Sequence, residues 1–177
     1  MLIDLLKARR SIRKFKSSPV EESKIKYIIE CGRISPSACN LQPYRFIVLS
    51  GGFKKRFDEA VFSGIYSVCS FVKKAPLSIV IVRLKPGFKT KIGSKLQDTD
   101  FSLIDIGIAG EHMIMAACEL GLGSLWVGWF DKKKAFDLLS LNRGETAEVM
   151  IVIGEKDEDP YERKKKNFDE IVIFKNE

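Results

Sequence analysis

The stretch Leu77-Ser78-Ile79-Val80-Ile81-Val82-Arg83 decides the fold of this 177-residue chain. Its apolar residues follow one another without alternation, which is typical of a central strand covered by other elements on both faces. Working outward from it, we expect strands at 45–49, 125–128 and 147–153 and a last short strand at 171–174. Helices are expected at 2–8, 53–61, 98–120 and 133–139, and another from the capping-box pattern Ser18-Pro19-Val20-Glu21 to Gly32. These elements predict an α+β or α/β fold with one sheet.

We expect residues 1–177 to form a single domain, because the chain shows no internal repeat and no low-complexity linker. With 45% hydrophobic and 30% charged residues it has the composition of a globular protein. The longest apolar stretch, 101–120, contains two glutamates, an aspartate and a histidine, so it is predicted to be a core or interface helix and not a membrane span. The segment 85–97 is expected to be a mobile connection. An export signal is not visible, which predicts a cytoplasmic protein.

The cysteines and the histidine exclude several kinds of site. The four cysteines are far apart and form no C-x-x-C pair, and His112 is the only histidine. A metal site and a dithiol redox motif are therefore not expected. The cysteines are interpreted as free buried thiols, at Cys31, Cys39, Cys69 and Cys118. His112 is interpreted as structural, so any catalysis would need a bound cofactor.

The charge balance predicts an anionic partner. The chain has 30 lysine and arginine residues against 23 aspartate and glutamate residues, a net charge of +7, with basic residues gathered at 7–16 and 163–166. It has no Walker sequence and no G-x-G-x-x-G after a strand, which argues against a nucleoside triphosphate or Rossmann site. The stretch Arg9-Arg10-Ser11-Ile12-Arg13 presents three guanidinium groups and a hydroxyl, which suit a phosphate or the polar edge of a flavin.

Four motifs, in this order along the chain, resemble the nitroreductase family of FMN-dependent oxidoreductases. They are RRSIRKF at 9–15 followed by Pro19-Val20, SPSACNLQPYRF at 35–46, GLGSLWVG at 121–128 and KKNFDEIV at 165–172. Together they span nearly the whole chain. In the last motif Asn167 replaces the family's usual proline.

The resemblance implies an α+β fold in which helices flank a mostly antiparallel central sheet. It also implies an intertwined homodimer that exchanges C-terminal arms and binds FMN at the subunit interface. The cofactor residues implied in one chain are Arg9, Arg10, Ser11, Arg13, Gly128 and either Lys165 or Lys166. Pro36, Ser37 and Asn40 are expected to come from the other subunit, and Gln42 of the same motif is included in the cofactor site.

The reaction implied by the resemblance is ping-pong hydride transfer. NADH or NADPH reduces the flavin and leaves, and a small electron-poor acceptor such as a nitroaromatic or a quinone then takes its place. Arg13 or Lys14 would stabilise the reduced ring, and no catalytic side chain is assigned. The short connections leave little room for a lid, so we expect an open or partner-completed substrate pocket, from which neither the substrate nor the preferred nicotinamide can be read.

Two other classes of function are kept as alternatives. A protein of the same fold could carry out reductive dehalogenation or flavin fragmentation. A protein that stores flavin, or a basic module that binds nucleic acid, would need no catalysis; nucleic acid and membrane partners are not expected.

Overall fold

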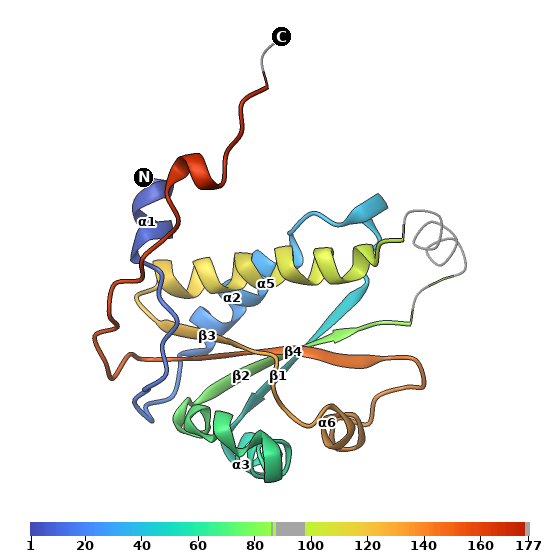
Figure 1. Cartoon of the computed structure of the whole chain (residues 1–177). Coiled ribbons are helices and arrows are strands. Elements are labelled where there is room, and N and C mark those ends of the chain that lie inside the picture. Colours follow the sequence, from blue (N-terminus) through green and yellow to red (C-terminus); the bar gives the residue numbers. More distant parts are fainter. Residues whose placement is uncertain (86, 88–97, 176–177) are drawn as a thin grey trace.

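The computed structural model describes residues 1–85, 87 and 98–175 (Figure 1). At the centre of the molecule is a four-stranded sheet with the order β1-β2-β4-β3, in which neighbouring strands are antiparallel. The strands are β1 (Tyr44–Ser50), β2 (Leu77–Arg83), β3 (Gly123–Val127) and β4 (Thr146–Gly154). The prediction of an α+β fold with one antiparallel sheet is confirmed, and the α/β alternative is excluded.

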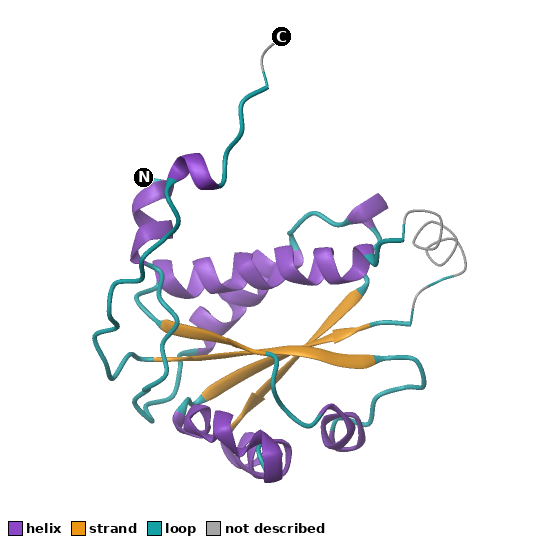
Figure 2. Ribbon diagram, viewed as in Figure 1, coloured by secondary structure: helices purple, strands orange, loops and turns teal. Residues whose placement is uncertain are grey.

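β2 is the buried centre of the sheet, as its uninterrupted apolar run predicts. Val80 lies opposite Ile47 of β1 on one side and opposite Met150 of β4 on the other. Helices cover both faces of the sheet (Figure 2), and each face has its own hydrophobic core. One face carries α2 (Glu22–Arg33) and α5 (Phe101–Glu119), and the other carries α3 (Gly51–Val61), the 3₁₀ helix η2 (Gly64–Lys74) and α6 (Lys132–Leu138).

α5 is the long apolar helix of the sequence. Its N-cap is Asp100, whose side chain accepts a hydrogen bond of 3.1 Å from the backbone N–H of Ser102. In length and mean hydropathy, 1.4, α5 could cross a membrane, but half of its most apolar window is buried inside the fold. It packs along α2 and against the sheet, so the prediction of a core helix is confirmed.

The start of α2 differs from the prediction. The helix begins at Glu22 with Glu21 as its N-cap and no capping hydrogen bond from a side chain, so the capping box predicted at Ser18 is wrong. The reason is that the preceding segment is held beside the chain that leaves β4. The backbone N–H of Lys16 donates to the carbonyl of Glu155 at 3.0 Å, which keeps this part of the chain extended.

The strand predicted at 171–174 is also wrong. After the 3₁₀ turn η3 (Phe168–Glu170), the tail runs away from the body as an irregular segment (Figure 1). A strand needs a neighbour to satisfy its backbone groups, and none of the described strands lies beside this one. The tail leaves Ile171, Ile173 and Phe174 exposed by 65%, 82% and 74%. Homodimerisation and arm exchange stay predictions.

The 3₁₀ helix η2 has no counterpart among the predicted elements, whereas α1 (Leu2–Ala8) has the bounds expected from the sequence. The connection expected at 85–97 lies outside the described residues except for Lys85 and Gly87.

Two glycines of α5 allow a matched test of packing. A Cβ atom at Gly110 would lie 2.2 Å from the Cη2 atom of the Trp126 ring, whereas a Cβ atom at Gly107 would have no atom within 4 Å. We expect Gly110→Ala to lower the free energy of unfolding by about 1–3 kcal/mol, because the ring must move. Gly107→Ala should raise it by about 0.5–1 kcal/mol, because alanine favours the helix. Urea denaturation followed by circular dichroism measures both, and equal stability of the two variants would contradict the close contact.

Candidate active site

The first part of the site is the segment that follows α1. Ser11 forms a parallel bridge with Ser124 of β3, and the backbone N–H of Ile12 donates to the carbonyl of Ser124 at 3.0 Å. Ile12 and Phe15 are 1% and 2% exposed, so their side chains anchor this segment in the core. The hydrophilic residues between and before them are thereby left at the surface.

The chain that leaves β4 is bound to the same segment. Phe15 forms an antiparallel bridge with Lys156, and the backbone N–H of Asp157 donates to the carbonyl of Lys14 at 3.0 Å. Oε1 of Glu158 accepts hydrogen bonds from the backbone N–H groups of Arg13 and Lys14. These contacts bring the C-terminal basic run back to the N-terminal one.

A pocket of about 500 Å³ lies between the two runs. It is lined by Leu6, Lys7, Arg9, Arg10, Ser11, Glu162, Arg163 and Lys165. A neighbouring pocket of about 140 Å³ shares Arg10, Ser11 and Arg163 and adds Arg13 to the lining. The structure therefore brings together the predicted residues Arg9, Arg10, Ser11, Arg13 and Lys165, whereas Lys166 lines neither pocket.

The larger pocket is strongly cationic. Five of its lining residues are lysine or arginine and one is glutamate. In the described part of the chain, Arg9, Arg10, Arg163 and Lys165 form no ion pair. The Arg10 guanidinium instead donates to the carbonyl of Lys7 at 2.5 Å. Such unpaired guanidinium and ammonium groups can hold a phosphate through charge-assisted hydrogen bonds.

A second group of predicted residues forms a loop around the 3₁₀ helix η1 (Ala38–Asn40). The buried carboxylate of Asp105 on α5 accepts a hydrogen bond from the backbone N–H of Ala38 at 3.0 Å. Inside the loop, Ser37 Oγ accepts from the backbone N–H of Gln42 at 3.0 Å, and the Gln42 amide donates to the carbonyl of Asn40 at 2.9 Å.

The backbone of this loop is unusual. Cys39, Asn40 and Gln42 have φ values of 52°, 54° and 45°, a conformation that non-glycine residues seldom adopt. Asn40 and Gln42 are exposed. Residues with strained backbone are more common at ligand-binding sites than elsewhere, so the observation favours a functional role for the loop.

The loop does not contact the cationic pocket of its own chain. Asp105 holds the loop near the start of α5, and Cys118 near the end of α5 lies against Leu5 of α1, with 3.9 Å between Sγ and the carbonyl oxygen. Asp105 and Cys118 are thirteen positions apart in α5, which corresponds to about 20 Å along the helix axis. Pro36, Ser37, Asn40 and Gln42 are therefore not brought to Arg10 within one chain.

Gly128 is also distant from the pocket. It follows β3, four residues beyond Ser124, which corresponds to about 13 Å along a strand. Among the described residues, no atom would lie within 4 Å of a Cβ atom at Gly128, so the packing of these residues does not require a glycine here. Its neighbour Trp129 donates from Nε1 to the carbonyl of Ile65 at 3.3 Å.

Sequence reasoning missed three residues that line the cationic pocket or its smaller neighbour, Lys7, Glu158 and Arg163. Arg163 belongs to a basic run that was recognised, but only Lys165 and Lys166 of that run were chosen. Lys7 lies in the basic run at 7–16 but precedes the motif at 9–15, although its carbonyl accepts a hydrogen bond from Arg10. Glu158 was missed because its hydrogen bonds cross 144 and 145 positions of the sequence.

The surroundings of the cysteine beside the pocket do not favour the reactive thiolate form. Cys118 lines a small neighbouring cavity of about 100 Å³ together with Arg9 and Arg10. Burial raises the pKa of its thiol, while the charges of Lys156 and Arg9 act in the opposite direction. The thiol is thus protonated near neutral pH. All four cysteines are free, but the prediction that they are buried is wrong: Cys39 is exposed on the loop at 36–42, and the other three are half-buried.

Comparisons with known proteins identify the family. A model described as "Nitroreductase family" matches residues 6–68, and a model described as "Putative TM nitroreductase" matches residues 73–177, more than half of the chain. The chain belongs to the nitroreductase family. The resemblance stated from the four sequence motifs is confirmed.

Solved nitroreductase structures share the fold. A nitroreductase family protein from Clostridium difficile 630 is 25% identical, with a TM-score of 0.80 and 98% of each chain covered. An "FMN-dependent Nitroreductase" from Clostridium difficile R20291 is 30% identical, with a TM-score of 0.75, and the match covers 98% of this chain and 99% of that one.

Relatives in the family carry more than one name. A "Putative NADH dehydrogenase/NAD(P)H nitroreductase" of Methanothermobacter thermautotrophicus is 29% identical over 72% of this chain, and the match covers 60% of that protein. A "Putative NAD(P)H nitroreductase" of Streptococcus pyogenes is 24% identical over 96% of this chain and 97% of the relative. An "Iodotyrosine deiodinase" of Thermotoga neapolitana is 24% identical over 99% of this chain and 98% of the relative.

Proposed function

We propose that this nitroreductase-family chain binds FMN and uses NADH or NADPH to reduce small electron-poor acceptors such as nitroaromatics or quinones. The observation that supports the proposal most directly is the cationic pocket in which Arg10 and Lys165, from opposite ends of the chain, line one cavity. The family of the chain and the solved neighbour described as FMN-dependent support the same function.

The donor set of the pocket fits the phosphate end of FMN. A phosphate monoester is close to a dianion at neutral pH, and burying it requires several charge-assisted hydrogen bonds. Arg9, Arg10 and Lys165 can donate these bonds, and Ser11 adds a hydroxyl. The cavity of about 500 Å³ also lies within the usual range for small-molecule sites.

Once bound, FMN would supply the hydride chemistry, accepting a hydride from the nicotinamide and passing it to the acceptor. The side chains of this protein would bind the cofactor and orient it. Arg9, Arg10 and Lys165 would hold the phosphate, and Arg13 in the neighbouring pocket would lie nearer the polar edge of the ring. His112 is exposed on α5, and we assign no proton donor, because water can reach an open site.

We further propose that a second copy of the chain completes each site. The loop at 36–42 has exposed polar groups and strained backbone but lies about 20 Å along α5 from the pocket of its own chain. The C-terminal tail exposes Ile171, Ile173 and Phe174 next to that pocket's end of the molecule. A partner that covers the tail and contributes its own loop would account for both features.

One alternative reaction has specific support. The relationship to the iodotyrosine deiodinase extends over almost the full length of both proteins. The same phosphate pocket would serve reductive dehalogenation, since the reactions differ in the acceptor and not in the anchoring of the cofactor. A flavin-fragmenting enzyme, a flavin store and a nucleic-acid-binding module are less well supported, because the cations converge on a cavity of ligand size.

The function is tested on the purified protein with its spectrum. We expect a yellow protein that binds FMN, loses its flavin absorbance on anaerobic addition of NADH or NADPH, and regains it with menadione or a nitroaromatic. Iodide release from 3-iodotyrosine, with little quinone reduction, would favour dehalogenation. A colourless protein with no affinity for added FMN would contradict the proposal.

The assignment of the phosphate pocket is tested with a matched pair of lysines. Lys165 lines the pocket and Lys166 does not. We expect Lys165→Gln, and the double variant Arg9→Ala with Arg10→Ala, to weaken FMN binding by at least about 10-fold, because charge-assisted bonds are lost. Lys166→Gln, which removes the same charge, should change the affinity for FMN by less than about 3-fold. Fluorescence titration with FMN measures all three, and equal effects of the two lysine variants would refute the assignment.

The second copy is tested by sedimentation velocity. We expect the full chain to sediment as a dimer. The double variant Ile173→Ser with Phe174→Ser should shift it toward the monomer, because it removes two exposed apolar side chains that the partner would bury. Asp169→Ser lies on the same tail and is the control. A monomer at all concentrations for the unmodified chain would overturn the two-chain site.

A further inference from the structure

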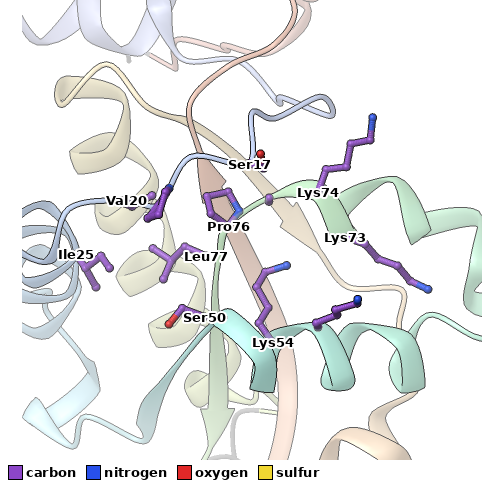
Figure 3. A pocket seen from close by; sticks show the side chains of 13 residues that line it. Ser17, Val20, Ile25, Ser50, Lys54, Lys73, Lys74, Pro76 and Leu77 are labelled. Carbon is purple, nitrogen blue, oxygen red and sulfur yellow. The ribbon is translucent and has the colours of Figure 1, made fainter.

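A second pocket lies at the other edge of the sheet, where β1 ends and β2 begins (Figure 3). Its volume is about 510 Å³, as large as the cationic pocket described above. It is lined by Ser17, Pro19, Val20, Ile25, Ser50, Gly51, Lys54, Lys55, Lys73, Lys74, Ala75, Pro76 and Leu77. We call it the lysine pocket.

The lysine pocket is separate from the cationic pocket. Leu77 and Ser50 pair with each other on β2 and β1, whereas Ser11 of the cationic pocket pairs with Ser124 on β3. β1 and β3 are the two edge strands of the sheet, three strand spacings apart, which is about 14 Å. The two pockets have no lining residue in common.

Lys54 is the buried cation of the lysine pocket. It is 4% exposed, and its Nζ donates to Oδ2 of Asp58 at 2.5 Å. Asp58 is itself buried, with its second oxygen, Oδ1, lacking a hydrogen-bond partner. An ammonium group has three N–H donors, and Asp58 accepts one of them. The two side chains form a buried salt bridge, so Asp58 offsets the charge of Lys54, which keeps two further N–H donors. Figure 3 shows Lys54 rising from α3 toward Pro76.

The rim of the pocket carries three more lysines. Lys55, Lys73 and Lys74 are exposed, and within the described part of the chain none of them forms an ion pair. Among the described residues that line the pocket there is no carboxylate; Asp58 lies behind the lining, where it contacts Lys54 and feels the charge of Lys73. Lys73 and Lys74 point in different directions (Figure 3), which reduces the repulsion between their charges.

The start of α3 adds to the positive potential of the lysine pocket. Ser50 is the N-cap of this 11-residue helix and makes no capping hydrogen bond with its side chain. The first N–H groups of the helix therefore lack that partner, and the helix dipole favours an anion at this end. Ser50 and Gly51 both line the pocket, so the helix start faces the same space as the four lysines.

The floor of the lysine pocket is apolar. Val20, Ile25, Pro76 and Leu77 provide a surface against which a ring or an aliphatic body can pack. A bare inorganic ion would leave this surface uncovered, and a polymer would need an open groove in place of a single cavity. The combination fits a compact ligand that has an apolar part and a multiply charged phosphate part.

We propose that the lysine pocket is a second anion site, which binds an organic phosphate of the size of a nucleoside diphosphate. The phosphates lie between Lys54, the rim lysines and the start of α3. The body of the ligand lies on the apolar floor. The site goes beyond the proposed FMN function, because it shares no residue with the FMN pocket.

The test is calorimetric titration of the full-length, FMN-saturated protein with ADP at low salt. We expect one ADP site, and we expect Lys55→Gln with Lys73→Gln and Lys74→Gln to weaken its binding by about 10-fold or more. The control removes three positive charges elsewhere, with Lys26→Gln, Lys133→Gln and Arg143→Gln, and should leave the affinity within about 3-fold. Both triple variants change exposed residues only, so the fold is kept.

Other outcomes would overturn the proposal. Absence of ADP binding, or equal weakening in both triple variants, would show that no built site exists there. The double variant Arg9→Ala with Arg10→Ala separates the two pockets. Loss of ADP binding in this variant, with normal binding in the rim-lysine variant, would place ADP in the cationic pocket instead.

Discussion

Three backbone hydrogen bonds of 3.0 Å hold residues 12–16 between the start of β3 and the chain that leaves β4. They run from Ile12 to Ser124, from Lys16 to Glu155 and from Asp157 to Lys14. With Ile12 and Phe15 buried beneath them, these bonds fix the direction in which α1 departs and the path by which the tail returns. Both basic runs of the sequence therefore meet at one cavity, although they are far apart along the chain.

Most of the fold was predictable from local patterns. The apolar runs at 77–83 and 147–153 could be recognised because each strand is buried by neighbours on both faces, which removes alternation from the sequence. Predictions failed where a distant part of the chain decides the local structure. Ser18 carries a capping pattern, but the bond between Lys16 and Glu155 holds its surroundings extended. The tail at 171–174 has strand-like residues without a strand beside them.

The site was predictable only in part, and for a different reason. Guanidinium groups at Arg9, Arg10 and Arg13 point to an anion by their chemistry, whatever the fold. That Arg10 and Lys165 line the same cavity could be predicted only from the resemblance, because nothing local connects the two ends of the chain. Glu158 and Arg163 could not be chosen from the sequence, since an acidic residue and a basic residue in a charged tail resemble any solvated segment. The loop at 36–42 was indicated by its motif, but its distance from the pocket of its own chain, about 20 Å along α5, could not be read from the sequence.

The sheet and the cationic pocket depend on different parts of the chain. β4 ends at Gly154, whereas Arg163 and Lys165, which line the pocket, follow on an exposed connecting segment. A protease that cuts this segment, for example at the exposed Tyr161, would leave all four strands in place but would separate these two cations from the body of the protein. Anion binding is therefore more sensitive to proteolysis than the sheet is.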